Sequence, residues 1–529
     1  MAEKTTRSDK KEFLGIKANG PVFITSLVII LGLVLTTLIV GKPMEAWFNK
    51  TQNYIADHVG WFFILLVNGL LIFAIFLGFG KFKNIRIGGA DAKPEFTTLG
   101  WFSMLFSAGM GIGLLFWSVS EPIFHFNSNP FMKNPENKVA AAKEAMGITF
   151  LHWGIHAWAL YAIIGLALAF FTFNRKLPLT IRSVFHPLFG DKIHGPIGDV
   201  IDIISVIATL FGLATSLGLG VKQVNAGLEY LFGIDNNEMV QVILIAVITF
   251  FATLSLILGI DKGIRMLSEW NMRLAIFLML FMLVVGPTLF LFKSFVQNIG
   301  HYIYEFFELS FWTNTYKGVG QETNWQNTWT VFYWAWWISW SPFVGIFIAR
   351  ISKGRTIKEF IFGVLLVPTL FTFLWMSIFG GSAIYQELLG NHDVTVAVKE
   401  DVSTAVYYLL EQYPLTSFAS IVTVLLVASF FVTSSDSGSF VVDTLTSGGR
   451  HDAPKGQKIF WASMEGLVAA VLLVGGGLTA LQTASIITGL PFAIIIIVMC
   501  FSFYKSLTEY SEENKEELKP VKKNKKAIG

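Results

Sequence analysis

The side chains with the clearest chemical potential lie between Trp329 and Phe343, a segment that reads W-T-V-F-Y-W-A-W-W-I-S-W-S-P-F. Positions i, i+3, i+4 and i+7 share one face of a helix, so a helix here groups four aromatic rings. Ring faces attract a quaternary ammonium group, which has no N–H to donate, and each desolvated ring contributes about 2 kcal/mol. The pattern therefore predicts a site for a methylated amine, lined by Tyr333, Trp336, Trp337 and Trp340.

An aromatic belt at a membrane surface is the alternative explanation, because Trp and Tyr collect at the level of lipid headgroups. A belt accounts well for Trp325 and Trp329. It accounts less well for Trp336, Trp337 and Trp340, which continue into the apolar segment beside a Ser-Trp-Ser-Pro sequence. We therefore favour the binding interpretation.

A second candidate site is the glycine-rich sequence S-A-G-M-G-I-G at Ser107–Gly113. Each glycine inside a helix costs about 1 kcal/mol relative to alanine, so we expect the helix to unwind here. Unwound carbonyls can ligate a cation, and unwound amides can hold a carboxylate. Close helix packing through Gly109 and Gly113 is the alternative.

The sequence Ser339-Trp340-Ser341-Pro342 predicts a second interrupted span. Interrupted spans at corresponding positions of two halves are typical of carriers built from inverted repeats, with a site near the membrane midplane. Spans three to seven and eight to twelve would form the two repeats.

The third candidate is F-F-V-T-S-S-D-S-G-S at Phe430–Ser439. Sodium prefers oxygen ligands, so the hydroxyls of Thr433 and Ser434 could bind it together with unwound carbonyls. Alternatively, these hydroxyls donate to carbonyls one turn earlier. Two carboxylates in or near spans also require an explanation, because a charge inside a membrane is costly. We expect Asp436 to cap a helix or to pair near the end of its span. We expect Glu121, which precedes Pro122, to end its span at the outer surface in a structural role.

The composition indicates the class of protein to which these motifs belong. The chain has 529 residues, of which 53% are hydrophobic and only 14% charged, and its mean hydropathy is +0.60. These values are typical of a polytopic membrane protein. Apolar stretches of about 20 residues, enough to cross a bilayer, predict twelve spans that begin near Pro21, Trp61, Thr98, Ile148, Pro196, Met239, Arg273, Trp329, Phe360, Leu415, Ile459 and Ala484. A further helix at Ser294–Phe311 is too polar to cross and is predicted to lie on the outer surface.

Basic residues gather in alternate loops, which predicts that both termini are cytoplasmic. With this sorting, the net charge of +3 gives no reason to expect a nucleic acid partner. The single cysteine, Cys500, excludes an intramolecular disulfide. The charged tail at Tyr510–Gly529 could touch anionic lipid headgroups or be simply solvated.

Four motifs resemble those of the betaine/choline/carnitine transporter family: G-M-G-I-G (Gly109–Gly113), H-W-x-x-H-x-W-A-x-Y (His152–Tyr161), F-Y-W-A-W-W-I-S-W-S-P-F (Phe332–Phe343) and F-F-V-T-S-S-D-S (Phe430–Ser437). The resemblance implies an all-α membrane protein of about twelve helices with a LeuT-like core of two inverted five-helix repeats preceded by two extra helices, assembled as a homotrimer in a bacterial cytoplasmic membrane. The implied organisation is a cytoplasmic segment (1–20), two additional helices (21–93), the first repeat (94–293), a surface helix and outer loop (294–327), the second repeat (328–506) and a charged cytoplasmic tail (507–529).

The resemblance also implies roles for individual residues. The substrate's ammonium group would lie among Trp153, Trp158, Tyr161 and Trp337, with Trp336, Trp340 and Phe332 along the adjacent pathway, and its carboxylate near Gly109, Met110, Gly111 and Gly113. The main sodium site would use Ser107, Met110, Phe430, Thr433 and Ser434. A second sodium site would use Thr209 and Phe343, but Leu213 stands where that site needs a threonine. For His152 and His156 we expect helix packing or local hydrogen bonds.

Together these features predict a sodium-coupled importer of glycine betaine for osmoprotection, with Na⁺ as coupling ion and no organic cofactor. Choline-specific relatives resemble this motif with an aspartate at the position of Gly113, so glycine there favours a zwitterion. A choline importer and a carnitine or betaine exchanger remain as alternatives. Alternatives from a different functional class are an ion channel and a membrane enzyme. An enzyme would need clustered His, Glu or Cys, which none of the spans offers.

Overall fold

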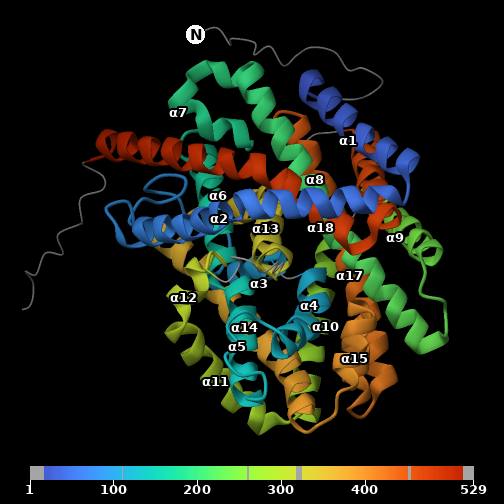
Figure 1. Cartoon of the computed structure of the whole chain (residues 1–529). Helices are drawn as coiled ribbons and strands as arrows, with labels where there is room; N and C mark the ends of the chain where they lie inside the picture. Colours follow the sequence, from blue (N-terminus) through green and yellow to red (C-terminus); the bar gives the residue numbers. More distant parts are fainter. Residues whose placement is uncertain (1–16, 110, 259–260, 317–324, 451–453, 516–529) are drawn as a thin grey trace, which may run out of the picture.

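The computed structural model describes residues 17–109, 111–258, 261–316, 325–450 and 454–515 (Figure 1). Every regular element in these ranges is a helix, which confirms the all-α prediction. The elements are α1 (Gly20–Val40), α2 (Pro43–Phe79), α3 (Thr98–Gly109), α4 (Ile112–Asn127), α5 (Lys138–Trp153), α6 (Ile155–Phe173), η1 (Ile181–Phe185), α7 (His186–Phe189), η2 (Gly190–His194), α8 (Pro196–Phe232), α9 (Glu238–Leu258), α10 (Asp261–Val285), α11 (Thr288–Tyr304), α12 (Phe306–Phe311), η3 (Asn327–Val331), α13 (Phe332–Ile351), α14 (Ile357–Leu388), α15 (Asp393–Glu400), η4 (Val402–Thr404), α16 (Ala405–Glu411), α17 (Thr416–Thr446) and α18 (Lys455–Glu513).

Ten stretches of helix in the described part of the chain are long and apolar enough to cross a membrane. The third predicted span is divided into α3 and α4, each of which is too short to cross alone. The last two predicted spans form one element, α18, which bends at Gly476 and Gly477. The backbone of Gly477 has φ +55, a conformation that favours glycine. The divided span and the bend account for the difference from the twelve predicted crossings.

The helices that carry the candidate motifs form the centre of the molecule. In the apolar windows of α5–α6 and of η3–α13, 94% of residues are buried, against 28% in α9 and α10. Helix α13 packs against α6, α8 and α18, and α4 packs against α5 and α14 (Figure 1). Most apolar residues on α9 and α10 are therefore exposed on the outside of the chain, whereas those on α13 face other helices.

Two helix breaks lie next to the candidate motifs, one at a predicted place and one at an unpredicted place. The predicted break in the glycine motif is confirmed, because α3 ends at Gly109 and α4 begins at Ile112 after an extended Gly111. The unpredicted break lies at Gly154, between α5 and α6. A side chain at position 154 would place its Cβ 2.3 Å from the carbonyl oxygen of Phe150, so only glycine fits there.

The predicted interruption at Ser339–Pro342 is wrong, because α13 runs through it without a break. Pro342 has no N–H to donate to the carbonyl of Ile338. The hydroxyl of Ser341 donates to that carbonyl instead, at 2.6 Å. The serine thus supplies the hydrogen bond that the proline removes, and the helix continues.

The predicted surface helix at Ser294–Phe311 is confirmed as helical, although it begins earlier and breaks at Glu305 to give α11 and α12. Helix α11 packs against α5 and α14.

Two loops distant in sequence join in a short main-chain clasp, formed by residues 83–87 and 354–358. Ile87 donates its N–H to the carbonyl of Arg355, and Gly354 donates to the carbonyl of Ile87, both at 2.9 Å. Ile357 and Lys358 continue the pairing, with N–H bonds to the carbonyls of Ile85 and Lys83. The clasp connects the end of α2 to the turn between α13 and α14.

Candidate aromatic binding site

The predicted aromatic residues of α5, α6 and α13 come together in one cluster. The ring of Trp337 lies 5.0 Å from that of Trp153, at 73° to it. Tyr161 faces Trp337 and Trp340, with its ring 6.4 Å from each, and Trp158 packs on Tyr161 at 5.7 Å. All five rings are at least 95% buried. The break at Gly154 positions them, because it lets Trp153 end one helix while Trp158 and Tyr161 project from the next.

A second layer of rings extends the cluster along α13. Trp336 stacks on Trp337 with ring centroids 4.6 Å apart, and Phe332 stacks on Trp336 at 5.4 Å. A Cβ added to Gly113 would lie 2.5 Å from the Cη2 atom of Trp336 and 3.3 Å from that of Trp153. Glycine at position 113 therefore lets both indoles approach the backbone of α4.

The polar atoms of the cluster divide into two groups. The indole N–H of Trp337 donates to the carbonyl of His152 at 3.0 Å, and that of Trp153 donates to Glu121 at 2.6 Å. In contrast, the indole nitrogens of Trp336 and Trp340 and the hydroxyl of Tyr161 have no hydrogen-bond partner in the described part of the chain. A buried donor without an acceptor costs about 1–3 kcal/mol. The cluster thus holds three buried donors that a ligand could satisfy.

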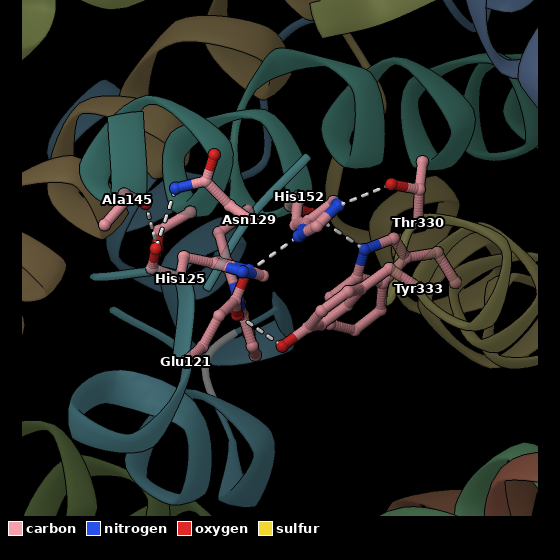
Figure 2. Close-up of polar contacts among 10 residues, drawn as sticks. Glu121, His125, Asn129, Ala145, His152, Thr330 and Tyr333 are labelled. Atoms are coloured by element: carbon pink, nitrogen blue, oxygen red, sulfur yellow. Dashed lines mark hydrogen bonds and ion pairs between the residues drawn. The ribbon is translucent and has the colours of Figure 1, made fainter. Parts of the chain in front are cut away.

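The prediction that Glu121 ends its span at the outer surface is wrong. Helix α4 continues beyond Pro122 to Asn127, and the Glu121 side chain is fully buried. Its carboxylate accepts hydrogen bonds from His152 Nδ1 at 2.7 Å, from the indole of Trp153 and from the hydroxyl of Tyr333 (Figure 2). It therefore connects α4, α5 and α13 beside the aromatic cluster.

The two histidines of the span-four motif are buried in helix packing, as predicted, but their hydrogen bonds reach residues on other elements and are not local. The second ring nitrogen of His152 bonds to Thr330 Oγ1 at 3.0 Å, and the ring of His152 stacks on Tyr333 at 4.6 Å. His156 Nε2 lies 3.2 Å from Asn68 Oδ1 on α2.

The amino-acid sequence contains only partial signals for the cluster around Glu121. Its carboxylate comes from α4, its imidazoles from α4 and α5, and its hydroxyls from η3 and α13. The available signals were the unusual cost of a carboxylate inside an apolar span and the spacing of Glu121 and His125, four residues apart.

The structure describes only some of the residues that are predicted to bind sodium. Met110 and the side chain of Ser107 lie outside the described residues. The Thr433 hydroxyl lies 3.1 Å from the carbonyl oxygens of Ser429 and Phe430 and accepts a hydrogen bond from Asn271 at 3.2 Å. This contact with Ser429 is the back-bonded arrangement that the sequence left as the alternative. Ser434, next along α17, is partly buried.

At the doubtful second sodium site, Thr209 donates to the carbonyl of Ser205 at 2.7 Å, and Phe343 packs on Trp340 at 5.6 Å. Leu213 is fully buried against Gly438 of α17, where an added Cβ would lie 2.4 Å from its side chain. Asp436, one turn from Thr433, is also buried.

Comparison with known proteins supports the resemblance over almost the whole chain. A family model described as betaine/carnitine/choline family transporter matches residues 21–512. A glycine betaine transporter of Bacillus subtilis is 45% identical over 501 residues, covering 95% of this chain and 97% of that protein. A glycine betaine/proline/choline/ectoine transporter of Vibrio parahaemolyticus is 45% identical over 513 residues, covering 95% and 90%. A glycine betaine/proline/choline transporter of the same organism is 42% identical over 526 residues, covering 97% and 93%.

Proposed function

The chain belongs to the betaine/carnitine/choline family of transporters, and from this premise we propose that it is a sodium-coupled importer of glycine betaine. It is a multi-pass membrane transporter and not an enzyme. Glycine betaine carries a trimethylammonium group at one end and a carboxylate at the other. The proposal assigns each end a set of side chains.

The trimethylammonium group binds among Trp153, Trp158, Tyr161 and Trp337. The observation that carries this assignment is the near-perpendicular pair of Trp153 and Trp337, whose ring centroids are 5.0 Å apart. Perpendicular indoles can present two π faces to one cation, and each desolvated face contributes about 2 kcal/mol. Because the rings are now in contact, binding requires them to separate.

The carboxylate binds at the break between α3 and α4, near Gly111 and Gly113, where the rings of Trp340 and Trp336 approach the backbone. Buried donors on these rings have no partner without substrate. The Trp336 and Trp340 indoles and the Tyr161 hydroxyl supply such donors on the same rings that form the cluster. Charge-assisted hydrogen bonds to a carboxylate are about twice as strong as neutral ones. Glycine betaine satisfies these donors, whereas choline, which carries a hydroxyl in place of the carboxylate, offers them a weaker acceptor.

Gly113 supports the same choice of substrate. An aspartate at this position would supply a negative charge for a cation without its own carboxylate. Its Cβ would first have to displace the indole of Trp336, which lies 2.5 Å from the required position. A zwitterion makes that charge unnecessary.

Sodium coupling is supported by the hydroxyls of Thr433 and Ser434 on α17. The family resemblance combines them with carbonyls at the break between α3 and α4 to form a sodium site. A sodium ion would compete with the present bonds of Thr433 to Ser429 and Phe430. Each positive charge moved inward gains roughly 2.3 kcal/mol per 100 mV of membrane potential. The sodium gradient would thereby drive uptake.

The basic loops support a cytoplasmic location of both termini in a bacterial cytoplasmic membrane. Arg86, Lys93, Lys353 and Arg355 all lie in the two loops next to the clasp. A homotrimeric assembly is proposed on the family resemblance alone.

Uptake of radiolabelled glycine betaine into proteoliposomes tests the function. Uptake should require an inward sodium gradient and should saturate, and excess unlabelled choline or carnitine should compete less well than unlabelled betaine. Equal uptake with potassium in place of sodium would contradict the coupling. Stronger competition by choline would instead identify a choline importer, and non-saturating flux would identify a channel.

The variant Thr433→Ala should raise the sodium concentration for half-maximal uptake about fivefold, because it removes a neutral ligand worth roughly 1 kcal/mol. Thr423→Ala is the matched control, since Thr423 lies on the same helix and donates to the carbonyl four residues earlier at 2.9 Å. Equal sodium activation curves for the two variants would exclude Thr433 as a ligand.

A further inference from the structure

A group of three buried side chains beside the aromatic cluster has the composition of a metal site. Glu121, His125 and His152 each offer one ligand atom, and these three atoms lie within 4.8 Å of one another (Figure 2). All three residues are fully buried. His125 and Glu121 lie one turn apart on α4, and His152 reaches them from the end of α5.

His125 is the member of the group that hydrogen bonding does not explain. Neither of its ring nitrogens has a hydrogen-bond partner among the described residues. Its Nε2 faces Glu121 Oε1 at 3.5 Å, too far for a good hydrogen bond. Around it are the rings of Trp329 at 4.5 Å and Trp325 at 5.3 Å, and the indole nitrogen of Trp325 likewise has no hydrogen-bond partner among the described residues. A buried imidazole normally finds a partner, and a metal ion at Nε2 would be one.

One of the separations between these atoms already suits a small divalent ion, and a second would have to lengthen. Zinc binds imidazole nitrogen and carboxylate oxygen at about 2.0–2.2 Å, which separates neighbouring ligand atoms by roughly 3.3 Å in tetrahedral geometry. The separation between His125 and Glu121 already has this size. His152 Nδ1, now 2.7 Å from Glu121 Oε1, would need to move away by roughly half an ångström and to lose its proton.

The surroundings of the three residues resemble an outer shell around a metal site. The second ring nitrogen of His152 lies 3.0 Å from the Thr330 hydroxyl, so it can donate there while Nδ1 binds a metal. The second oxygen of Glu121 accepts hydrogen bonds from Trp153 and Tyr333, which leaves Oε1 for the metal. Such outer contacts fix the orientation of metal ligands.

We propose that Glu121, His125 and His152 bind a divalent first-row transition-metal ion, of which Zn²⁺ is the type. Two imidazoles and one carboxylate favour this class over Na⁺, Mg²⁺ and Ca²⁺, which prefer all-oxygen sites. The proposal is independent of the identity of the transported substrate.

Binding of Co²⁺ to the purified full-length chain tests the proposal. The protein is freed of its affinity tag and of metal with a chelator, and Co²⁺ is then titrated in detergent without substrate. We expect one Co²⁺ per chain, with the intense visible absorption of a four- or five-coordinate site. Zn²⁺ should displace it. No stoichiometric binding, or only the weak absorption of a hydrated six-coordinate ion, would overturn the proposal.

Variants separate the proposed ligands from other buried histidines. His125→Asn should weaken Co²⁺ binding more than about hundredfold, and Thr330→Ala should weaken it about ten- to hundredfold, as is typical of an outer-shell contact. His156→Asn is the matched control, because it removes another fully buried imidazole and should leave binding unchanged. Unchanged binding by His125→Asn would overturn the proposal.

X-ray absorption at the zinc edge of the wild-type protein decides the question even if a variant fails to fold. We expect a shell of only nitrogen and oxygen ligands with the scattering of two imidazoles. A sulfur ligand, which would place the metal at Cys500 or a methionine, would contradict the site.

Discussion

At the scale of single residues, Glu121 links the aromatic cluster to the neighbouring helices by hydrogen bonds. The carboxylate orients the indole of Trp153, and the backbone carbonyl of neighbouring His152 orients that of Trp337. Both indole N–H groups are thereby satisfied within the protein, so a cation would contact the π faces of these rings once they separate. The spacing of Tyr333, Trp336, Trp337 and Trp340 predicted the shared face because helical periodicity is local.

The role of Glu121 could not be predicted in the same way. Its hydrogen-bond partners come from two other elements, α5 and α13, so these contacts depend on tertiary packing and leave no spacing in the sequence. The presence of Pro122 even suggested a helix end, although the structure accommodates this proline inside α4.

Replacement of Trp337 should weaken substrate binding more when the whole ring is removed than when only the indole N–H is removed. Trp337→Ala loses one π face, worth about 2 kcal/mol, so the apparent Kd for glycine betaine should rise roughly 30-fold. Trp337→Phe keeps a ring but loses the bond to the His152 carbonyl, and should have a smaller effect. Binding is measured by equilibrium dialysis with purified protein.

The control for this pair is Trp61→Ala, because the Trp61 side chain is 57% exposed on α2. An unchanged Kd in Trp337→Ala would remove this residue from the site.

Gly113→Ala should reduce affinity by crowding the cluster. The new Cβ would lie 2.5 Å from Trp336, so this indole or the backbone has to move. Overpacking of this kind costs about 1–3 kcal/mol, and we expect a rise in apparent Kd of roughly tenfold. Gly69→Ala on α2 serves as the control, since an added Cβ there meets no atom within 4 Å. Wild-type affinity in Gly113→Ala would contradict this account of the close contact.

At the scale of elements, the sequence predicted one helix break correctly and a second one wrongly. Three glycines within Gly109–Gly113 weaken a helix whatever surrounds it, so the break between α3 and α4 followed from composition. At Pro342 the outcome depended on the Ser341 hydroxyl, whose rotamer decides whether the Ile338 carbonyl is satisfied. The break at Gly154 escaped notice because one glycine gives a weak signal.

Ser341→Ala should destabilise the protein because it leaves the Ile338 carbonyl buried without a donor. The expected loss is about 1–3 kcal/mol, seen as a fall in Tm by a fluorescence-based thermal assay. The double variant Ser341→Ala, Pro342→Ala should recover most of this loss, since residue 342 then has an N–H for the same carbonyl. Equal Tm values for the single and double variants would contradict the proposed compensation.

At the scale of the whole molecule, composition and apolar stretches were sufficient to predict the membrane class and the approximate number of crossings. They could not predict which helices are central, because α9 and α13 are both strongly apolar. Burial separates them: α13 is surrounded by other parts of the chain, whereas most of the surface of α9 is exposed.

The last helix is fixed to the first half of the chain through Arg175, in the loop after α6. The Arg175 guanidinium donates to the side chain and carbonyl of Ser506, each at 3.0 Å, and to Glu513 at 2.6 Å. Arg175→Ala should therefore speed amide hydrogen exchange at the end of α18, measured by mass spectrometry. Glu513→Gln should have little effect, because an exposed ion pair contributes little. Equal exchange in wild type and Arg175→Ala would show that this contact does not hold the helix.

The clasp between residues 83–87 and 354–358 restricts how the carrier can change shape. Sliding of α2 along α13 would break four main-chain hydrogen bonds at once. Helices α2 and α13 therefore move together as one rigid unit. We expect release of substrate to the cell interior to come from the tilting of α3 or α17 away from this unit.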